Sequence, residues 1–164
     1  IPFTPPFLFK DALPLTVVDA TPGSSLLGLA TTLGSKLVGN ASNNNQKTDK
    51  AGFLVILPDN WMEGSIVALR ARVKKDTTLA TVLDKVDMTA KLQGDDAVGS
   101  DLVTTSPQQV TVAYANYDFS LPGTSLRRGD HLWCQLVLDS NDTGGAVNRA
   151  MWCSRLWALL ALVS

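Results

Sequence analysis

The chain has 164 residues and a mass of 17.5 kDa, which suits one domain and leaves too little chain for two domains of ordinary size. Hydrophobic residues make up 45% of the sequence, charged residues make up 18%, and the net charge is −1. This composition excludes a disordered or strongly acidic chain. Nucleic-acid binding would require a basic stripe, which this near-neutral sequence does not supply, so we expect no nucleic-acid partner.

The first 20 residues are predicted to form an extended arm, followed by a single β-sandwich domain over residues 21–164. Three prolines within residues 1–9 rule out a helix there, and the segment has no basic region of the kind that opens a signal peptide. Apolar side chains outside a strand pattern need a surface on which to dock, so we expect the arm to bind a partner. Its candidate contact residues are Phe3, Pro5, Pro6, Phe7 and Phe9.

The next predicted elements are short or weakly patterned strands. Residues 13–20 and 25–32 are moderately apolar and predict weak strands, whereas residues 52–57 form one continuous apolar run, which indicates a buried strand. Between them, residues 39–50 are polar and show no period, a composition typical of an exposed loop.

Alternation of apolar and polar residues predicts the long strands. In residues 65–74, 85–93 and 131–139 every second residue is apolar, and a period of two is typical of a half-buried strand. The expected inward side chains are Val67, Leu69, Ala71 and Val73; Val86, Met88, Ala90 and Leu92; and Leu132, Cys134, Leu136 and Leu138. Residues 109–121 show the same pattern with a shift of register at Ala115 and Asn116, which we interpret as a bulge within one strand.

Turn-forming residues separate these runs, and no amphipathic helix of three turns stands out. We therefore predict an all-β fold, an antiparallel β-sandwich of jelly-roll type with an extended N-terminal arm. Residues 151–163 are rich in leucine and alanine; we interpret them as a buried strand, with a helix as the alternative. The apolar part of this segment is too short to span a membrane and contains Arg155, so no membrane partner is expected.

The sequence contains no recognisable catalytic centre. His131 is the only histidine, which removes the usual catalytic triads and metal-ligand pairs, and no nucleophile has a base to activate it. We expect no enzyme activity, no cofactor and no metal site. Residues 139–144 hold oxygen ligands at spacings that a calcium loop could use, but they lack the acidic residue that completes an EF-hand, and a turn is the favoured interpretation.

Two further groups of residues have competing interpretations. The first comprises Arg70, Arg72, Lys74 and Lys75. Strand alternation alone generates such a basic face, and a solvated face is favoured over contact with an acidic protein surface. The second group is Cys134 and Cys153, both in strand-like segments, for which two buried thiols are favoured over a disulfide.

Seven segments occur in an order that resembles a known family. They are residues 54–61, 65–73, 86–90, 94–102, 116–119, 128–130 and 136–145. Over residues 50–147 the chain is similar to small jelly-roll virion proteins of tailed bacteriophages, the capsid decoration or cement proteins and related head appendages. The resemblance implies a structural virion protein, made in the host cytoplasm, that binds the major capsid protein on the outer surface of the head as a homotrimer and stabilises the shell.

Aromatic side chains are the candidate anchors of such an interface, because aromatic residues often dominate binding energy between proteins. We select Trp61, Tyr114 and Trp133. Trp61 lies between a turn and a long strand, a position that also suits core packing at the end of a sandwich.

Two other functions remain open. The first is a jelly-roll glycan-recognition module of a viral tail or head fibre. Its site would use Trp61 together with carboxylate side chains from the turns between strands, and it would show clustered, exposed aromatic side chains. A capsid subunit of a small icosahedral virus shares the jelly roll and the arm. Such arms are commonly basic, however, whereas residues 1–15 carry only Lys10 and Asp11 as charged residues.

Overall fold

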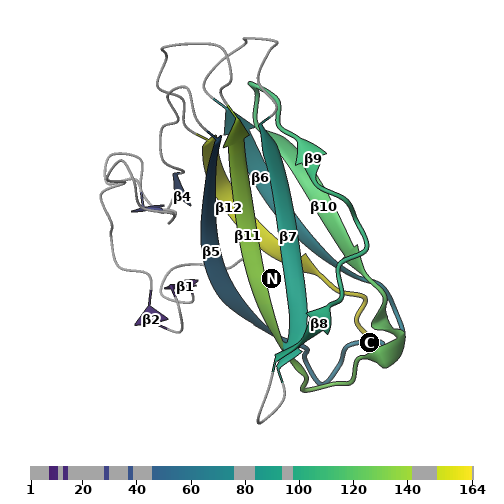
Figure 1. The fold of residues 1–164 in the computed structure, drawn as a ribbon. Helices are drawn as coiled ribbons and strands as arrows, with labels where there is room; N and C mark the ends of the chain where they lie inside the picture. Colours follow the sequence, from purple (N-terminus) through teal and green to yellow (C-terminus); the bar gives the residue numbers. More distant parts are fainter. Residues whose placement is uncertain are drawn as a thin grey trace.

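The computed structural model describes residues 8–10, 13–14, 28–29, 37–38, 46–75, 84–93, 98–141 and 151–163 (Figure 1). The strands within these residues are β1 (Leu8–Lys10), β2 (Leu13–Pro14), β3 (Gly28–Leu29), β4 (Leu37–Val38), β5 (Gln46–Ile56), β6 (Val67–Lys75), β7 (Lys85–Gln93), β8 (Val98–Asp101), β9 (Gln108–Gln109), β10 (Ala115–Leu121), β11 (His131–Asn141) and β12 (Met151–Leu159). A single short 3₁₀ helix in the described part of the chain, η1 (Gly123–Ser125), follows β10.

The strands form two antiparallel sheets that face each other as a sandwich of jelly-roll type, so the predicted fold class is confirmed. The larger sheet has the order β2-β1-β5-β11-β7-β8, with β9 also paired to β7, and the smaller sheet has the order β10-β6-β12-β4-β3. From β5 onward the chain passes repeatedly from one sheet to the other, and Figure 1 shows β5, β11 and β7 in front of β12, β6 and β10.

The core between the sheets is built by strand alternation. On β6, buried residues alternate with half-buried residues along the whole strand, which confirms the predicted inward set. On β11 the predicted inward residues are also buried, and on β7 all are buried except Leu92, which is half-buried. The largest fully buried side chains include Phe53, Trp61 and Phe119. Each such apolar side chain contributes about 1.5–3 kcal/mol by leaving water.

The prediction of one bulged strand over residues 109–121 is wrong. β9 pairs with β7 in the larger sheet, whereas β10 pairs with β6 in the smaller sheet. The residues between them carry the chain from one sheet to the other, so the shift of register at Ala115 and Asn116 marks a change of sheet. The main-chain N–H of Thr111 donates a hydrogen bond of 2.9 Å to the hydroxyl of Tyr117 and stabilises this crossing.

The prediction of a loop over residues 39–50 is wrong from residue 46 onward, because β5 begins at Gln46. The ladder between β5 and β11 runs from the Ile56–His131 pair to the Gln46–Asn141 pair. Within it, the hydroxyl of Thr48 donates a hydrogen bond of 3.0 Å to Asp139. Cross-strand pairing therefore overrides a composition that looks unfavourable for a strand. Residues 39–45 lie outside the described residues.

Short strands are described in the N-terminal region. β2 and β3 fall within the predicted weak strands over residues 13–20 and 25–32, whose other residues lie outside the described part of the chain. β1 pairs with both β2 and β5. Part of the segment predicted as an arm is thus a strand of the larger sheet.

The C-terminal segment forms β12, which confirms the predicted strand. β12 pairs with β6 and β4. Its register against β6 shifts between Cys153 and Arg155, and this bulge affects which side chains face outward.

Candidate functional site

The structure places the predicted contact residues of the N-terminal segment only in part. Phe3, Pro5, Pro6 and Phe7 lie outside the described residues. Phe9 lies in β1, where its backbone is in register with Gly52 of β5. The predicted role of these residues in partner binding stays a prediction.

Trp61 lies in the core, so the expectation that it contacts a partner is wrong and the alternative of core packing is correct. Its side chain is 0% exposed. A Cβ atom added to Gly123 would lie 3.0 Å from the Trp61 ring, which shows how closely η1 packs against the indole. Trp61 also forms an isolated antiparallel bridge with Leu162. It therefore ties the C-terminal segment to the end of the sandwich.

Tyr114 and Trp133 are not brought together. Trp133 is half-buried on β11, between Leu54 of β5 and Lys91 of β7 in the larger sheet. Tyr114 precedes β10 of the smaller sheet, and its ring lies near the cationic groups of Arg72 and Lys74. The two candidate anchors thus belong to different sheets of the sandwich.

The predicted basic face is only partly correct. Arg70, Arg72 and Lys74 alternate outward on β6, but Lys75 is buried. Alternation turns Lys75 inward, because it follows an outward residue. Its Nζ lies 3.7 Å from a carboxylate oxygen of Asp84, which is also buried.

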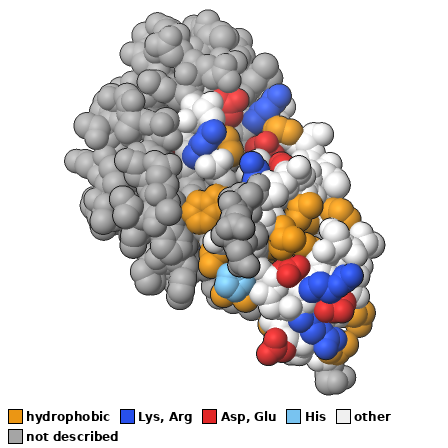
Figure 2. Space-filling model, turned by 60° about the horizontal axis from the view of Figure 1, so that its bottom comes forward, with side chains coloured by type: hydrophobic (Ala, Val, Ile, Leu, Met, Phe, Trp, Pro, Cys, Tyr) orange, Lys and Arg blue, Asp and Glu red, His pale blue; other side chains and the backbone are white. Residues whose placement is uncertain are grey.

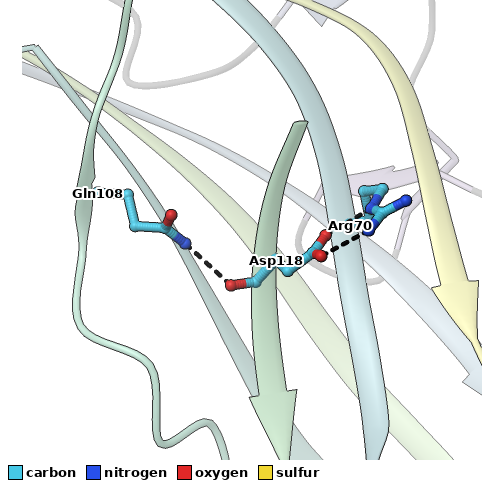
Figure 3. Close-up of polar contacts among 3 residues, drawn as sticks. All are labelled: Arg70, Gln108 and Asp118. Carbon is cyan, nitrogen blue, oxygen red and sulfur yellow. Dashed lines mark hydrogen bonds and ion pairs between the residues drawn. The ribbon is translucent and has the colours of Figure 1, made fainter. Parts of the chain in front are cut away.

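Arg70 is matched by an acid on the neighbouring strand. Its guanidinium donates two hydrogen bonds to the carboxylate of Asp118 on β10, of 2.5 and 2.6 Å (Figure 3). The side-chain amide of Gln108 donates a hydrogen bond of 2.9 Å to the main-chain oxygen of Asp118. The hydrogen bonds from Arg70 lower the pKa of Asp118 below its ordinary value of 3.8. The positive charge of Arg70 and the negative charge of Asp118 cancel, so this pair adds no net charge to the outer face.

Arg72 has a different environment. Its register partners are Asn116 on β10 and Arg155 on β12. Among the described residues, neither Arg72 nor Arg155 has a carboxylate partner. Arg72, Lys74 and Arg155 are called the cationic cluster below. The sequence alone does not reveal this cluster, because the register that joins β6 to β12 is not visible in a local pattern.

A second feature missed by the sequence analysis is an apolar surface at the end of the sandwich that holds Trp61. We call it the end patch. It consists of Met62, Ile66, Leu159, Leu162 and Val163, all exposed by between 38% and 65%. Figure 2, in which this end of the molecule is turned forward, shows hydrophobic side chains interspersed with acidic and basic ones. The signal in the sequence would have been apolar residues at outward positions or outside the strands, such as Ile66 in the run 65–74 and Met62 before it.

Main-chain hydrogen bonds hold the segments of the end patch together. Met62 N–H donates to the oxygen of Ala161, and Val163 N–H donates to the oxygen of Asn60, both at 2.8 Å. The neighbouring turn is also fixed, because Arg128 Nε donates a hydrogen bond of 2.9 Å to the oxygen of Trp61. Gly129 takes a positive φ of 80° in this turn. These hydrogen bonds therefore hold the segments that carry the end patch in a fixed arrangement.

The remaining candidate chemical groups are buried or isolated. Cys134 and Cys153 are free and buried, in agreement with the favoured interpretation. Burial raises the pKa of the Cys153 thiol to about 12 and raises that of Cys134 as well. His131 is exposed at the start of β11.

The residues that the structure describes contain no group of three or more His, Cys, Asp or Glu side chains that could hold a metal ion. No helix in the same part of the chain is long and apolar enough to cross a membrane.

Comparisons with known proteins identify no family for this chain. No protein-family model matches the sequence, and no curated protein matches it. One solved structure, described as "CBM4 structure and function", is similar with a TM-score of 0.44 and 10% sequence identity, over 78% of this chain and 72% of that chain. The strand pairing and the burial described above define the fold of this chain.

Proposed function

We propose that this chain is a structural virion protein, a capsid decoration or cement protein that binds the major capsid protein on the outer surface of a tailed-phage head and stabilises the shell as a homotrimer. The observation that carries this proposal is the end patch. Exposed apolar side chains that gather on ordered backbone beside a charged turn are typical of protein–protein contact surfaces. The resemblance over residues 50–147 indicates the kind of partner.

The described side chains favour binding to another protein over catalysis. The two thiols are buried, and Lys75 and Asp84 form a buried pair that occupies both groups. A near-neutral surface gives little electrostatic attraction, so attachment would depend on buried apolar area and on many repeated contacts around the shell.

The test is co-sedimentation of the purified chain with phage heads that lack it, together with its solution mass by light scattering. Ile66→Asp places a charge in the end patch at a residue that is 65% exposed, and we expect at least about 10-fold weaker attachment, as for loss of an interface anchor. Val112→Asp is the matched control, because Val112 is 44% exposed and lies outside the end patch. Equal attachment of both variants, or no sedimentation of the unmodified chain, would overturn the proposal.

The second candidate is glycan recognition, favoured by one specific observation. Trp152 and Trp157 of β12 are half-buried on the outer face of the smaller sheet, opposite Lys74 and Arg70 of β6. Tyr114 lies beside Lys74, 5.4 Å from its Nζ to the ring centre. Aromatic rings grouped with polar side chains on one sheet face could pack against sugar rings. The predicted version of this site, built on Trp61, is excluded because Trp61 is buried.

A further inference from the structure

The bulge in β12 brings two arginines into register. Cys153 faces Val73, so regular antiparallel pairing would place Ser154 opposite Arg72. Instead the register shifts and Arg155 faces Arg72. Ser154 becomes the extra residue, and its hydroxyl donates a hydrogen bond of 3.3 Å to the main-chain oxygen of Arg72. The bulge also keeps Arg155 out of the core and turns Leu156 inward. Like charges directly opposite each other destabilise a sheet, so the Arg72–Arg155 pair costs stability.

The other neighbour of Arg72 does not offset that charge. Asn116 of β10 faces Arg72, whereas Asp118 faces Arg70 two residues further along. Asp118 is engaged by both of its carboxylate oxygens with Arg70. The same strand pair thus supplies an acid to one arginine and a neutral amide to the other.

Aromatic side chains surround the cationic cluster. The ring centre of Tyr114 lies 5.8 Å from the guanidinium carbon of Arg72 and 5.4 Å from Nζ of Lys74. Along β12, Trp152 and Trp157 lie on either side of Arg155 and are half-buried. The cluster is therefore a group of cations bordered by aromatic side chains on the outer face of the smaller sheet.

We propose that the cationic cluster binds the sulfate or carboxylate group of an acidic carbohydrate. A guanidinium fork matches the geometry of either anion and binds it through two hydrogen bonds. The bordering aromatic rings would pack against the apolar faces of the sugar. Three cations on a chain of net charge −1 are too few for a nucleic-acid backbone, where affinity depends on neutralising several phosphates. This inference rests on the glycan-recognition candidate and names its ligand class.

The test measures binding of the full chain by calorimetry at physiological ionic strength. The probes are a sulfated heparin oligosaccharide, an oligogalacturonate and a neutral cello-oligosaccharide of similar length. We expect at least one acidic probe to bind and the neutral probe not to bind, and the two acidic probes separate sulfate from carboxylate recognition. The double variant Arg72→Gln and Arg155→Gln should bind at least about 10-fold more weakly, as expected for loss of charge-assisted hydrogen bonds. Arg127→Gln removes one positive charge at an exposed arginine outside the cationic cluster; it is the control for the loss of charge elsewhere and should bind normally.

Asn116→Asp provides an independent test that removes no contact. It supplies Arg72 with the acid that Arg70 already has, so the carboxylate should compete with the ligand and weaken binding by about 10-fold. Asn116→Ser is its neutral control, and thermal unfolding checks that each variant is folded. Normal binding by Asn116→Asp, or equal weakening by Arg127→Gln, would overturn the proposal.

The remaining outcomes distinguish a failure of this inference from a failure of the glycan-recognition candidate on which it rests. Equal binding of neutral and acidic saccharides would overturn the anion site and leave glycan recognition in place. Binding to none of the saccharides would overturn both. Equally tight binding of a polyglutamate peptide would overturn the saccharide assignment and identify an acidic protein surface as the partner.

Discussion

Lys75 and Arg70 lie on opposite faces of the same strand, β6, and each is paired with an aspartate. The Lys75–Asp84 pair is buried in the core, at 3.7 Å, whereas the Arg70–Asp118 pair lies on the outer face with side chains that are 32% and 43% exposed. Buried charges need their partners, since a lone charge in the core is costly, whereas an exposed pair gains little over hydration. Position on the strand, more than the shortness of the contact, decides what a pair contributes.

The largest effect is expected when the buried pair is broken. Lys75→Met removes the cation and leaves Asp84 charged in the core, which should lower the free energy of unfolding by about 3–5 kcal/mol. Urea unfolding at neutral pH measures this loss of stability. Lys50→Met, at an exposed position of β5, is the control and should change stability by less than about 0.5 kcal/mol. If both variants have the same stability, the contrast between the two faces of β6 does not hold.

A smaller effect is expected for the exposed pair. Asp118→Asn should lower the free energy of unfolding at neutral pH by about 0.2–1 kcal/mol, because solvent screens the interaction. Arg70 lowers the pKa of Asp118 below its ordinary 3.8 in the folded chain, so the stabilisation is present above that value and is lost as the pH falls through the folded pKa.

The pH dependence is the measurement that identifies the cause of this difference. Thermal unfolding of Asp118→Asn and the unmodified chain should differ at pH 6 and converge at strongly acidic pH. A difference that persists unchanged in acid would show that it comes from packing and not from the charge of Asp118.

The smallest expected effect concerns the unmatched arginines. Arg155→Gln removes the like-charge pair with Arg72 and should raise the free energy of unfolding by a few tenths of a kcal/mol, about the size of other cross-strand charge effects. Salt screens exposed charges, so the gain should shrink in concentrated salt. A loss of stability in Arg155→Gln would mean that Arg155 makes favourable contacts that outweigh the repulsion.

Much of the fold could be predicted from the sequence because strand alternation is a local property. The inward residues of β6 and β11 follow directly from it. The run of cations that contains Lys74 suggests an outward Lys75, although alternation alone turns it inward. Residues 109–121 resemble one strand because a local pattern cannot show that the partner strand changes.

The candidate surfaces were harder to predict because they depend on contacts between distant segments. Arg72 and Arg155 meet only through the register of β6 with β12 and the bulge at Ser154. The end patch combines the loop that carries Met62 and Ile66 with the C-terminal residues. Trp61 could be interpreted as a core residue or a contact residue, and only the closing of the sandwich by η1 and Leu162 decides between them.

The repeated passage of the chain between the two sheets also determines how the molecule folds. β5 can pair with β1 on one edge, but its other edge pairs with β11, and β6 pairs with β10 and β12, all of which come later in the chain. Such long loop closures cost entropy before any contact repays it, so slow folding is expected. During synthesis, β5 would emerge with one open hydrogen-bonding edge and β6 with two, and such edges are the sites where unfinished chains pair with one another. The larger sheet can be completed once β11 is available, and the smaller sheet only once β12 is available.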